Sequence, residues 1–255
     1  MDVPPGAPPP APADVGDEAG LGAFLGSLQL ADSAFPSGLY TLSYGLEAFA
    51  QAGLLRPADL GALLADYLRH GVGPADGAAL ACAHRAAEAD DLGLAAEADL
   101  RLTAVKLPRE ARESSHRTGR RLLATAGRVF GGGLLPPYAA RVRTGVAPGN
   151  HAVVLGLAMA LLRIPRERAL AGELYAFASS AVGSAVRLAA IDHLVAQEVL
   201  HGLKPVIAEV ALAHAESRVR DIAGCTPLID VMSMRHERAE LRLFMSCPPC
   251  PGEPA

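Results

Sequence analysis

Apolar residues recur along this chain at the spacing of amphipathic helices, and glycines or prolines separate the apolar segments. The first such segment ends before Gly53 and carries its apolar residues at Leu39, Leu42, Leu46 and Phe49. A second segment, 60–68, follows Pro57, which suits a first helical turn, and stops at Gly71. No segment shows the sustained alternation of period two that is typical of β-strands. The pattern predicts an all-α fold.

The same spacing divides the rest of the chain into further helices. The expected spans are 74–90, 93–107, 108–123, 151–162, 166–200 and 205–221. Asn150 is expected to be the N-cap of the fourth of these helices. Since no repeat of fixed period is present, we expect a single-domain bundle of roughly eight to ten helices over residues 21–246.

Both ends of the chain are rich in proline, with six prolines within residues 4–12 and four within 248–254. We expect residues 1–20 and 247–255 to be disordered tails. The beginning of the chain has neither the basic nor the apolar region of a secretion signal. The apolar runs 152–162 and 174–186 are shorter than the roughly 18 residues of a membrane helix. We therefore expect a soluble, cytoplasmic protein with no membrane partner.

Composition excludes several functional classes. Of the 255 residues 51% are hydrophobic, so a packed core is expected. The net charge of -4 and an aromatic content of 4% without tryptophan argue against a nucleic-acid partner. The four cysteines are too few and too scattered for a disulfide scaffold.

Metal ligands are present only in weak patterns. His193, Gln197 and His201 fall at i, i+4, i+8, but glutamine is a poor ligand for transition metals. Cys247 and Cys250 have CxxC spacing without a second pair. Ordinary helix packing is the preferred interpretation of the histidines, and we expect no bound cofactor.

Signatures of nucleotide and acyl chemistry are missing. The sequence holds no GxxxxGK[ST], no GxSxG and no HExxH. The glycines 131–133 have no strand before them and no lysine after them, so they predict a flexible turn. On these grounds we expect a protein that is not an enzyme.

Two charged segments have both a plain and a functional interpretation. Arg109, Arg112, His116 and Arg120 form one basic stripe on a helix. That stripe is either a solvated face, balanced by nearby glutamates, or a surface for an acidic partner. Residues 233–238, followed by the apolar 241–244, form either a last amphipathic turn or a segment that docks onto another protein.

Four blocks of the sequence resemble the family of urease accessory proteins called UreF. The blocks are Leu28–Glu47, Glu113–Leu123 (ESSHRTGRRLL), Gly149–Leu157 (GNHAVVLGL) and Ser233–Ser246 (SMRHERAELRLFMS). The first and last are specific. Together the blocks span residues 28–246.

The resemblance implies an all-helical homodimer that acts without catalysis in the maturation of urease by nickel insertion. It implies three partners: an accessory protein of the UreD (or UreH) type, a GTPase of the UreG type and apo-urease. Carried over by motif, the expected partner-binding residues are Pro36, Tyr44, Glu47, Arg187, Ser233, Arg235, His236, Glu237, Arg242 and Phe244.

Two other functions stay open beside this scaffold role. The chain could regulate the GTPase, with Arg187 or Arg235 reaching the nucleotide as an arginine finger does. It could instead carry nickel on His193, His201 and the cysteines of the tail.

Two surfaces are expected to make contacts with other chains. We expect an apolar face containing Leu155, Met159 and Leu162 to be available for dimerisation. We expect the segment 235–244 to be a docking element outside the stable core, so that deleting 235–255 abolishes partner capture and spares the fold.

Overall fold

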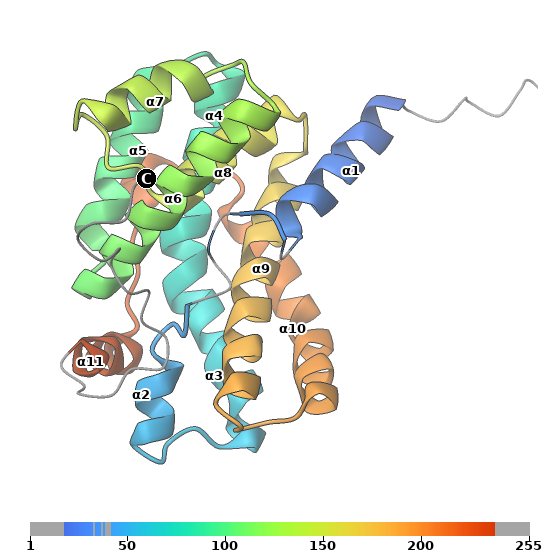
Figure 1. Cartoon of the computed structure of the whole chain (residues 1–255), viewed down its shortest axis with the longest axis vertical. Coiled ribbons are helices and arrows are strands. Elements are labelled where there is room, and N and C mark those ends of the chain that lie inside the picture. Colours follow the sequence, from blue (N-terminus) through green and yellow to red (C-terminus); the bar gives the residue numbers. More distant parts are fainter. Residues whose placement is uncertain (1–17, 33, 37, 39–41, 238–255) are drawn as a thin grey trace, which may run out of the picture.

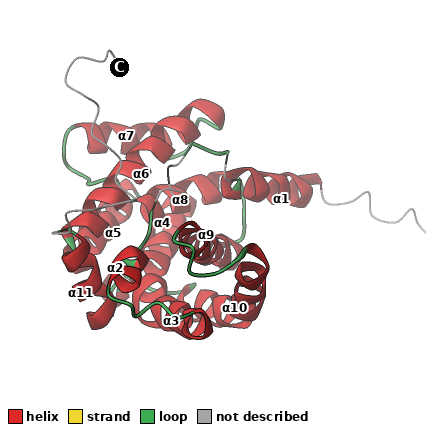
Figure 2. Cartoon of the chain, turned by 60° about the horizontal axis from the view of Figure 1, so that its bottom comes forward, coloured by secondary structure: helices red, strands yellow, loops and turns green. Residues whose placement is uncertain are grey.

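The computed structural model describes residues 18–32, 34–36, 38 and 42–237, and all regular structure among them is helical (Figures 1 and 2). The all-α prediction is confirmed. The helices are α1 Glu18–Ala31, α2 Leu46–Gln51, α3 Leu60–Tyr67, α4 Ala78–Glu88, α5 Leu92–Val105, α6 Arg109–Val129, α7 Leu135–Arg143, α8 His151–Leu161, α9 Arg166–Arg187, α10 His193–His214 and α11 Pro227–His236. The shorter segments are η2 Pro57–Asp59, η3 Leu68–Gly77 and η4 Val219–Asp221.

A continuous helical rod is formed by α3, η3 and α4, so the expected interruption between Gly71 and Pro74 is wrong. The middle part, η3, is a π-helix that contains Pro74. The wider turns of a π-helix accommodate Pro74, because the ring and the missing N–H of proline disturb the hydrogen bonding of an α-helix. At Gly73 a Cβ atom would come within 2.2 Å of Val210 on α10, so this glycine allows the rod and α10 to approach closely.

Helix α8 lies at the centre of the core, where it contacts α4, α6 and α9. Every residue from His151 to Met159 is buried. At Gly156 a Cβ atom would lie 2.6 Å from the carbonyl oxygen of Leu80, so the two backbones nearly touch. The core is built largely from alanine, leucine and valine, and small side chains permit this close helix packing.

The single helix expected over 166–200 is two helices, α9 and α10, which pack against each other as a hairpin (Figure 1). The chain leaves α9 through Ala189, whose φ of 54° is left-handed. It enters α10 at Asp192, whose carboxylate accepts hydrogen bonds from the backbone N–H groups of Leu194 and Val195, both at 2.9 Å.

The helix expected over 205–221 is also wrong, because α10 continues through Gly202 and Pro205 to His214. Leu203, Ile207 and Val210 are buried on one face of this helix, so tertiary packing outweighs the local signals. The turn expected at 131–133 is confirmed, with all three glycines at positive φ between α6 and α7.

Helix α1 projects from one side of the bundle (Figure 1) and begins at Glu18, inside the tail expected to be disordered. The rest of both tails lies outside the described residues. Leu155 and Met159 are buried, and together with residues of α1 they line one cavity. Leu162 lies against Gly26 of α1. The face expected to be available for dimerisation is therefore already covered by the chain's own first helix.

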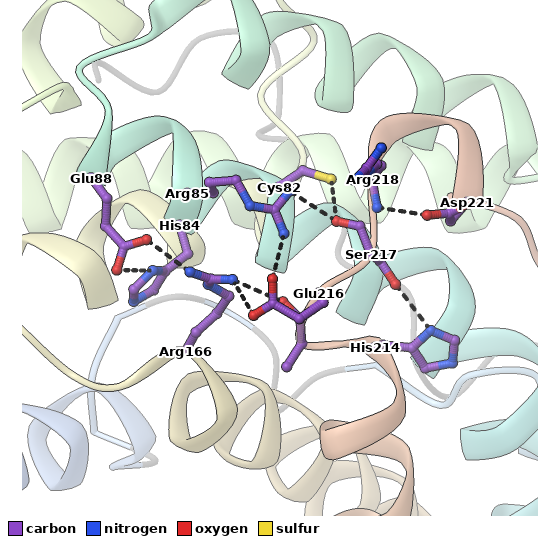
Figure 3. A network of polar contacts seen from close by, with 11 residues as sticks. Cys82, His84, Arg85, Glu88, Arg166, His214, Glu216, Ser217, Arg218 and Asp221 are labelled. Atoms are coloured by element: carbon purple, nitrogen blue, oxygen red, sulfur yellow. Dashed lines mark hydrogen bonds and ion pairs between the residues drawn. The ribbon is translucent and has the colours of Figure 1, made fainter.

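An ion-pair network joins α4, α9 and the end of α10 (Figure 3). Arg166 contacts Glu88 at 3.0 Å and Glu216 at 2.8 Å. Arg85 donates to the carbonyl oxygen of Ser217 at 3.1 Å. Helix α9 is long and apolar enough to span a membrane, and 61% of its apolar 18-residue stretch is buried within the bundle.

Candidate functional site

The imidazole of His236, near the end of α11, lies between carboxylates from two other helices. Its Nε2 is 2.9 Å from Oε2 of Glu47 on α2, and its Nδ1 is 2.8 Å from Oε2 of Glu110 on α6. His236 and Glu47 are almost fully buried, whereas Glu110 is 38% exposed. The hydrogen bonds to Glu110 and Glu47 raise the pKa of His236 above its ordinary value, although burial opposes them. The arrangement therefore favours an imidazolium that donates to both carboxylates.

Glu237 extends the same contact to the first turn of α6. Its Oε1 accepts a hydrogen bond from the backbone N–H of Glu110 at 3.1 Å, and its Oε2 lies 4.0 Å from Arg109. The first N–H groups of a helix have no partner within the helix, and the helix dipole favours a negative charge there. The end of α11 is thus attached to the beginning of α6 by two neighbouring side chains.

The turn that precedes α2 passes over α11. Gly45 has a φ of 83°, and a Cβ atom there would lie 2.9 Å from Oγ of Ser233. Beside it, Tyr44 also has a positive φ, of 51°, and its ring meets that of Phe177 edge-on at 4.7 Å. Glycine is the residue that fits both the left-handed backbone and the close approach to α11.

A groove of about 200 Å³ lies between this turn, α6 and α11. Its polar lining is Ser43, Tyr44, Tyr67, Arg109, Glu110, Glu113, Ser114, Arg117, Ser233 and Glu237. The first, second and fourth sequence blocks contribute to it, from positions 43 to 237. The described chain ends at one edge of this groove, at Glu237. We call this surface the α6–α11 groove.

The second and third blocks meet where α6 crosses the start of α8. A Cβ atom at Gly119 would lie only 2.0 Å from the carbonyl oxygen of Gly149. Asp99 on α5 is fully buried and accepts hydrogen bonds from the backbone N–H groups of Gly149 and Asn150, at 2.6 and 2.9 Å. The hydroxyl of Tyr138 also donates to Asp99, at 2.6 Å.

Asn150 is the N-cap of α8 as expected, but its side chain makes no cap hydrogen bond. Its amide Nδ2 instead donates to Asp99 at 2.7 Å and to Thr103 at 2.7 Å. The amide therefore joins α8 to α5. Asp99, Thr103 and Tyr138 were not identified from the sequence, because each is an ordinary polar residue in a helical segment.

A buried polar pair lies next to a cavity of about 120 Å³. Nε2 of His151 is 3.8 Å from Oε2 of Glu173, and neither atom has a hydrogen-bond partner. Burial raises the pKa of Glu173 to about 8 and lowers the pKa of His151 to about 4. Both side chains are consequently neutral near pH 7.

The remaining candidate residues lie in several places. Pro36 is exposed in the turn after α1, Arg187 is exposed in the last turn of α9, and Arg235 is exposed on α11. Arg242, Phe244, Cys247 and Cys250 lie outside the described residues. The structure brings together Glu47, Ser233, His236 and Glu237. The role of each residue in binding a partner stays a prediction.

Two histidines considered as metal ligands, His193 and His201, are exposed on α10. Within the described part of the chain, no group of three or more His, Cys, Asp or Glu side chains is arranged to hold a metal ion.

The basic stripe on α6 is partly used within the fold. Arg112 donates to the carbonyl oxygens of Lys106 and Leu107, at 2.6 and 2.7 Å, and His116 is 3.1 Å from the hydroxyl of Thr103. Arg109 and Arg120 are exposed. The stripe therefore combines helix-end contacts with exposed positive charge.

Residues 235–244 were expected to lie outside the stable core, and the beginning of this segment does not. His236 is 2% exposed and bonded to two helices, because only the folded chain brings Glu47 and Glu110 around it. The part of the segment after Glu237 lies outside the described residues.

Comparison with known proteins gives consistent matches. The family model described as UreF matches residues 55–204. Urease accessory protein UreF 2 of Brucella canis is 30% identical over 226 residues, which cover 89% of this chain and 93% of that protein. Urease accessory protein UreF of Paenarthrobacter aurescens is 33% identical over 219 residues, 86% of this chain and 96% of that protein. The UreF protein of Bacillus sp. (strain TB-90) is 29% identical over 223 residues.

Proposed function

Since this chain belongs to the UreF family of urease accessory proteins, we propose that it is a non-catalytic scaffold in the nickel-dependent maturation of urease. In this role it joins an accessory protein of the UreD or UreH type and a GTPase of the UreG type on apo-urease. The α6–α11 groove is the proposed docking site for the UreD-type protein. Nickel is handled by the assembled complex rather than held by this chain as a cofactor.

One observation carries the docking proposal. Residues of the first, second and fourth family blocks, far apart in the sequence, line a single groove, and the chain continues from Glu237 at its edge. The lining contains both carboxylates and guanidinium groups, which suit polar and charge-assisted contacts at the rim of an interface. Exposed Arg117 and Arg109 supply charge for specificity.

The proposed scaffold acts in the cytoplasm as a homodimer. Helix α1 exposes four apolar side chains at helical spacing, namely Leu21, Phe24, Leu25 and Leu28. From Ala19 to Ala31 this helix has no charged residue. Because a contiguous exposed apolar patch marks an interaction surface, this face supports contact with a second copy.

Regulation of the GTPase is the second candidate function. Arg187 and Arg235 are both exposed near helix ends, and an arginine that reaches a bound nucleotide must be accessible. The variants Arg187→Ala and Arg235→Ala distinguish the two roles when GTP turnover by the cognate GTPase is measured in the complex. Loss of turnover with normal assembly supports regulation, whereas unchanged turnover supports a scaffold.

The scaffold proposal is tested by co-purification of this chain with the UreD-type protein, the GTPase and apo-urease from cells that express all four. The variant Arg117→Glu reverses one charge on the rim of the α6–α11 groove. Arg128→Glu, exposed near the other end of the same helix, is the matched control. Capture of the UreD-type protein should fall only in the first variant. Equal capture by both variants would exclude the groove.

A further inference from the structure

Two carboxylates from separate helices face the two nitrogens of one buried imidazole. Only the imidazolium form of His236 has an N–H on both Nδ1 and Nε2, so only this form donates to Glu110 and Glu47 together. A neutral ring would have one donor and one lone pair. That lone pair would face a carboxylate oxygen at less than 3 Å and the attraction would become a repulsion.

Among the residues that the structure describes, charged and titratable groups around His236 come from each helix packed against it. Helix α2 contributes Glu47, whose other oxygen accepts a weak hydrogen bond from the neutral amide of Gln51 at 3.4 Å. The other groups are Arg109, Glu110 and Glu113 on α6, Tyr67 on α3, and Asp230, Arg235 and Glu237 on α11. Arg109 is 67% exposed and lies 3.7 Å from Glu113, which places it on the solvent side of the cluster.

Apolar contacts hold only the first part of α11. Ile229 and Met232 are buried against Ala48 and Phe49 of α2. Toward the end of the helix the packing is polar, through Ser233, His236 and Glu237. Loss of the imidazolium charge would therefore loosen the last turn of α11 and leave its beginning attached.

We propose that protonation of His236 is a switch that fixes the last turn of α11 on α2 and α6, and that deprotonation releases this turn and reshapes the α6–α11 groove. The switch rests on the proposed function only where it regulates docking of the UreD-type protein. Ser233 and Glu237, which line the groove, lie in the turn that the switch releases. The raised pKa of His236 puts the transition above pH 6.5, the ordinary value for histidine.

Amide hydrogen exchange of the isolated full chain tests the switch without any partner. Protection factors of amides 233–237, divided by those of α4, are measured between pH 6 and 9. In the wild type this ratio should fall about tenfold or more across the transition, the size expected when a buried charge-assisted hydrogen bond is lost. His236→Gln should give the low ratio at every pH. His70→Gln, at an exposed histidine on η3, should follow the wild type.

Glu110→Gln provides a second test that does not depend on the folding of the first variant. It removes one carboxylate that stabilises the imidazolium, so the transition should move to lower pH. A wild-type ratio that does not change with pH, or a Glu110→Gln transition at the wild-type pH, would overturn the switch. Capture of the UreD-type protein at the same pH values is a separate measurement. A working switch with unchanged capture would refute only its role in docking.

Discussion

Nε2 of His236 and Oε2 of Glu47 lie 2.9 Å apart, although the two residues are separated by 189 positions in the sequence. Both side chains are almost fully buried, and Glu110 completes the contact from α6. Helices α2 and α11 are therefore held together by charge as well as by packing. The contact also brings the first and last family blocks to one groove.

The buried carboxylate of Asp99 should contribute strongly to stability. Asp99→Ala would leave the N–H groups of Gly149 and Asn150 and the hydroxyl of Tyr138 without their acceptor. We expect the free energy of unfolding to fall by about 3 kcal/mol or more in urea denaturation. Asp90→Asn is the control, since Asp90 is exposed with a φ of 54° that asparagine tolerates, and it should change stability by less than about 0.5 kcal/mol.

Two glycines of α6 should respond to the same substitution in opposite directions. Gly119→Ala would bring a methyl group against the carbonyl oxygen of Gly149, and we expect it to lower the free energy of unfolding by about 2 to 3 kcal/mol. At Gly127 an added Cβ atom has no neighbour within 4 Å, so Gly127→Ala should raise the free energy of unfolding by up to about 1 kcal/mol. Urea denaturation of both variants checks this. Equal effects would show that α6 and α8 do not approach as described.

Much of the fold could be predicted from local sequence signals. Pro57 and Asn150 mark helix starts as expected, and α6 and α9 begin directly after Pro108 and Pro165, near the expected starts at 108 and 166. The predictions were wrong at Pro74 and Pro205, where packing against other helices outweighs local preference. The break at 188–192 was missed because no glycine or proline marks it.

The candidate site was only partly predictable. Glu47 and His236 lie in blocks that resemble the family, whereas Glu110 became visible only when α6 was placed beside α11. The partner of a buried side chain depends on how distant helices are packed. The position of α1 shows the same limit. The spacing of apolar residues predicts the apolar face of α8, but no local sequence signal indicates that α1 of the same chain covers that face.

The stability of the protein should depend on pH through Glu173. Its pKa is about 8 in the folded chain against an ordinary value near 4.5, so the folded state keeps a proton that the unfolded state releases. The stabilising contribution is complete below about pH 4.5 and is lost as the pH rises toward 8. Glu173→Gln removes this loss. In urea denaturation the free energy of unfolding of the variant should increase relative to that of the wild type as pH rises, by on the order of 4 kcal/mol at pH 8.

Two observations make that pH test specific. Glu167→Gln alters an exposed glutamate of the same helix, so its pH profile should run parallel to that of the wild type. His151 is present in all three proteins, and its lowered pKa affects stability only in acid, as the pH falls from about 6.5 toward 4. A constant difference between Glu173→Gln and the wild type from pH 5 to 9 would show that Glu173 is ionised in the folded chain.

The exposed face of α1 should control self-association. Leu25→Glu places a charge among Leu21, Phe24 and Leu28, and we expect light scattering at micromolar concentration to change from dimer to monomer. Leu212→Glu alters a leucine of α10 that is 68% exposed and should leave the dimer intact. A monomeric wild type would refute the homodimer, and a dimeric Leu25→Glu would exclude this face.

Truncation should separate partner capture from folding. A chain that stops after Glu237 keeps all of α11 and the contacts of His236, so we expect wild-type helicity by circular dichroism and an intact dimer. It lacks 238–246, the part of the fourth block that contains Arg242 and Phe244. Arginine and aromatic side chains dominate many interfaces, and capture of the UreD-type protein should therefore be lost together with urease activation in cells.

A second truncation gives the matched control for the first. Removing only 247–255 deletes the proline-rich end with Cys247 and Cys250 but keeps the fourth block complete. Capture should then remain close to that of the full chain, because the deleted residues have no counterpart in the family motif. Loss of capture in this shorter deletion would transfer the docking role to the cysteine-containing tail. Unfolding of the longer deletion would show that residues after Glu237 stabilise the domain, and normal capture by it would exclude 238–246 as a docking element.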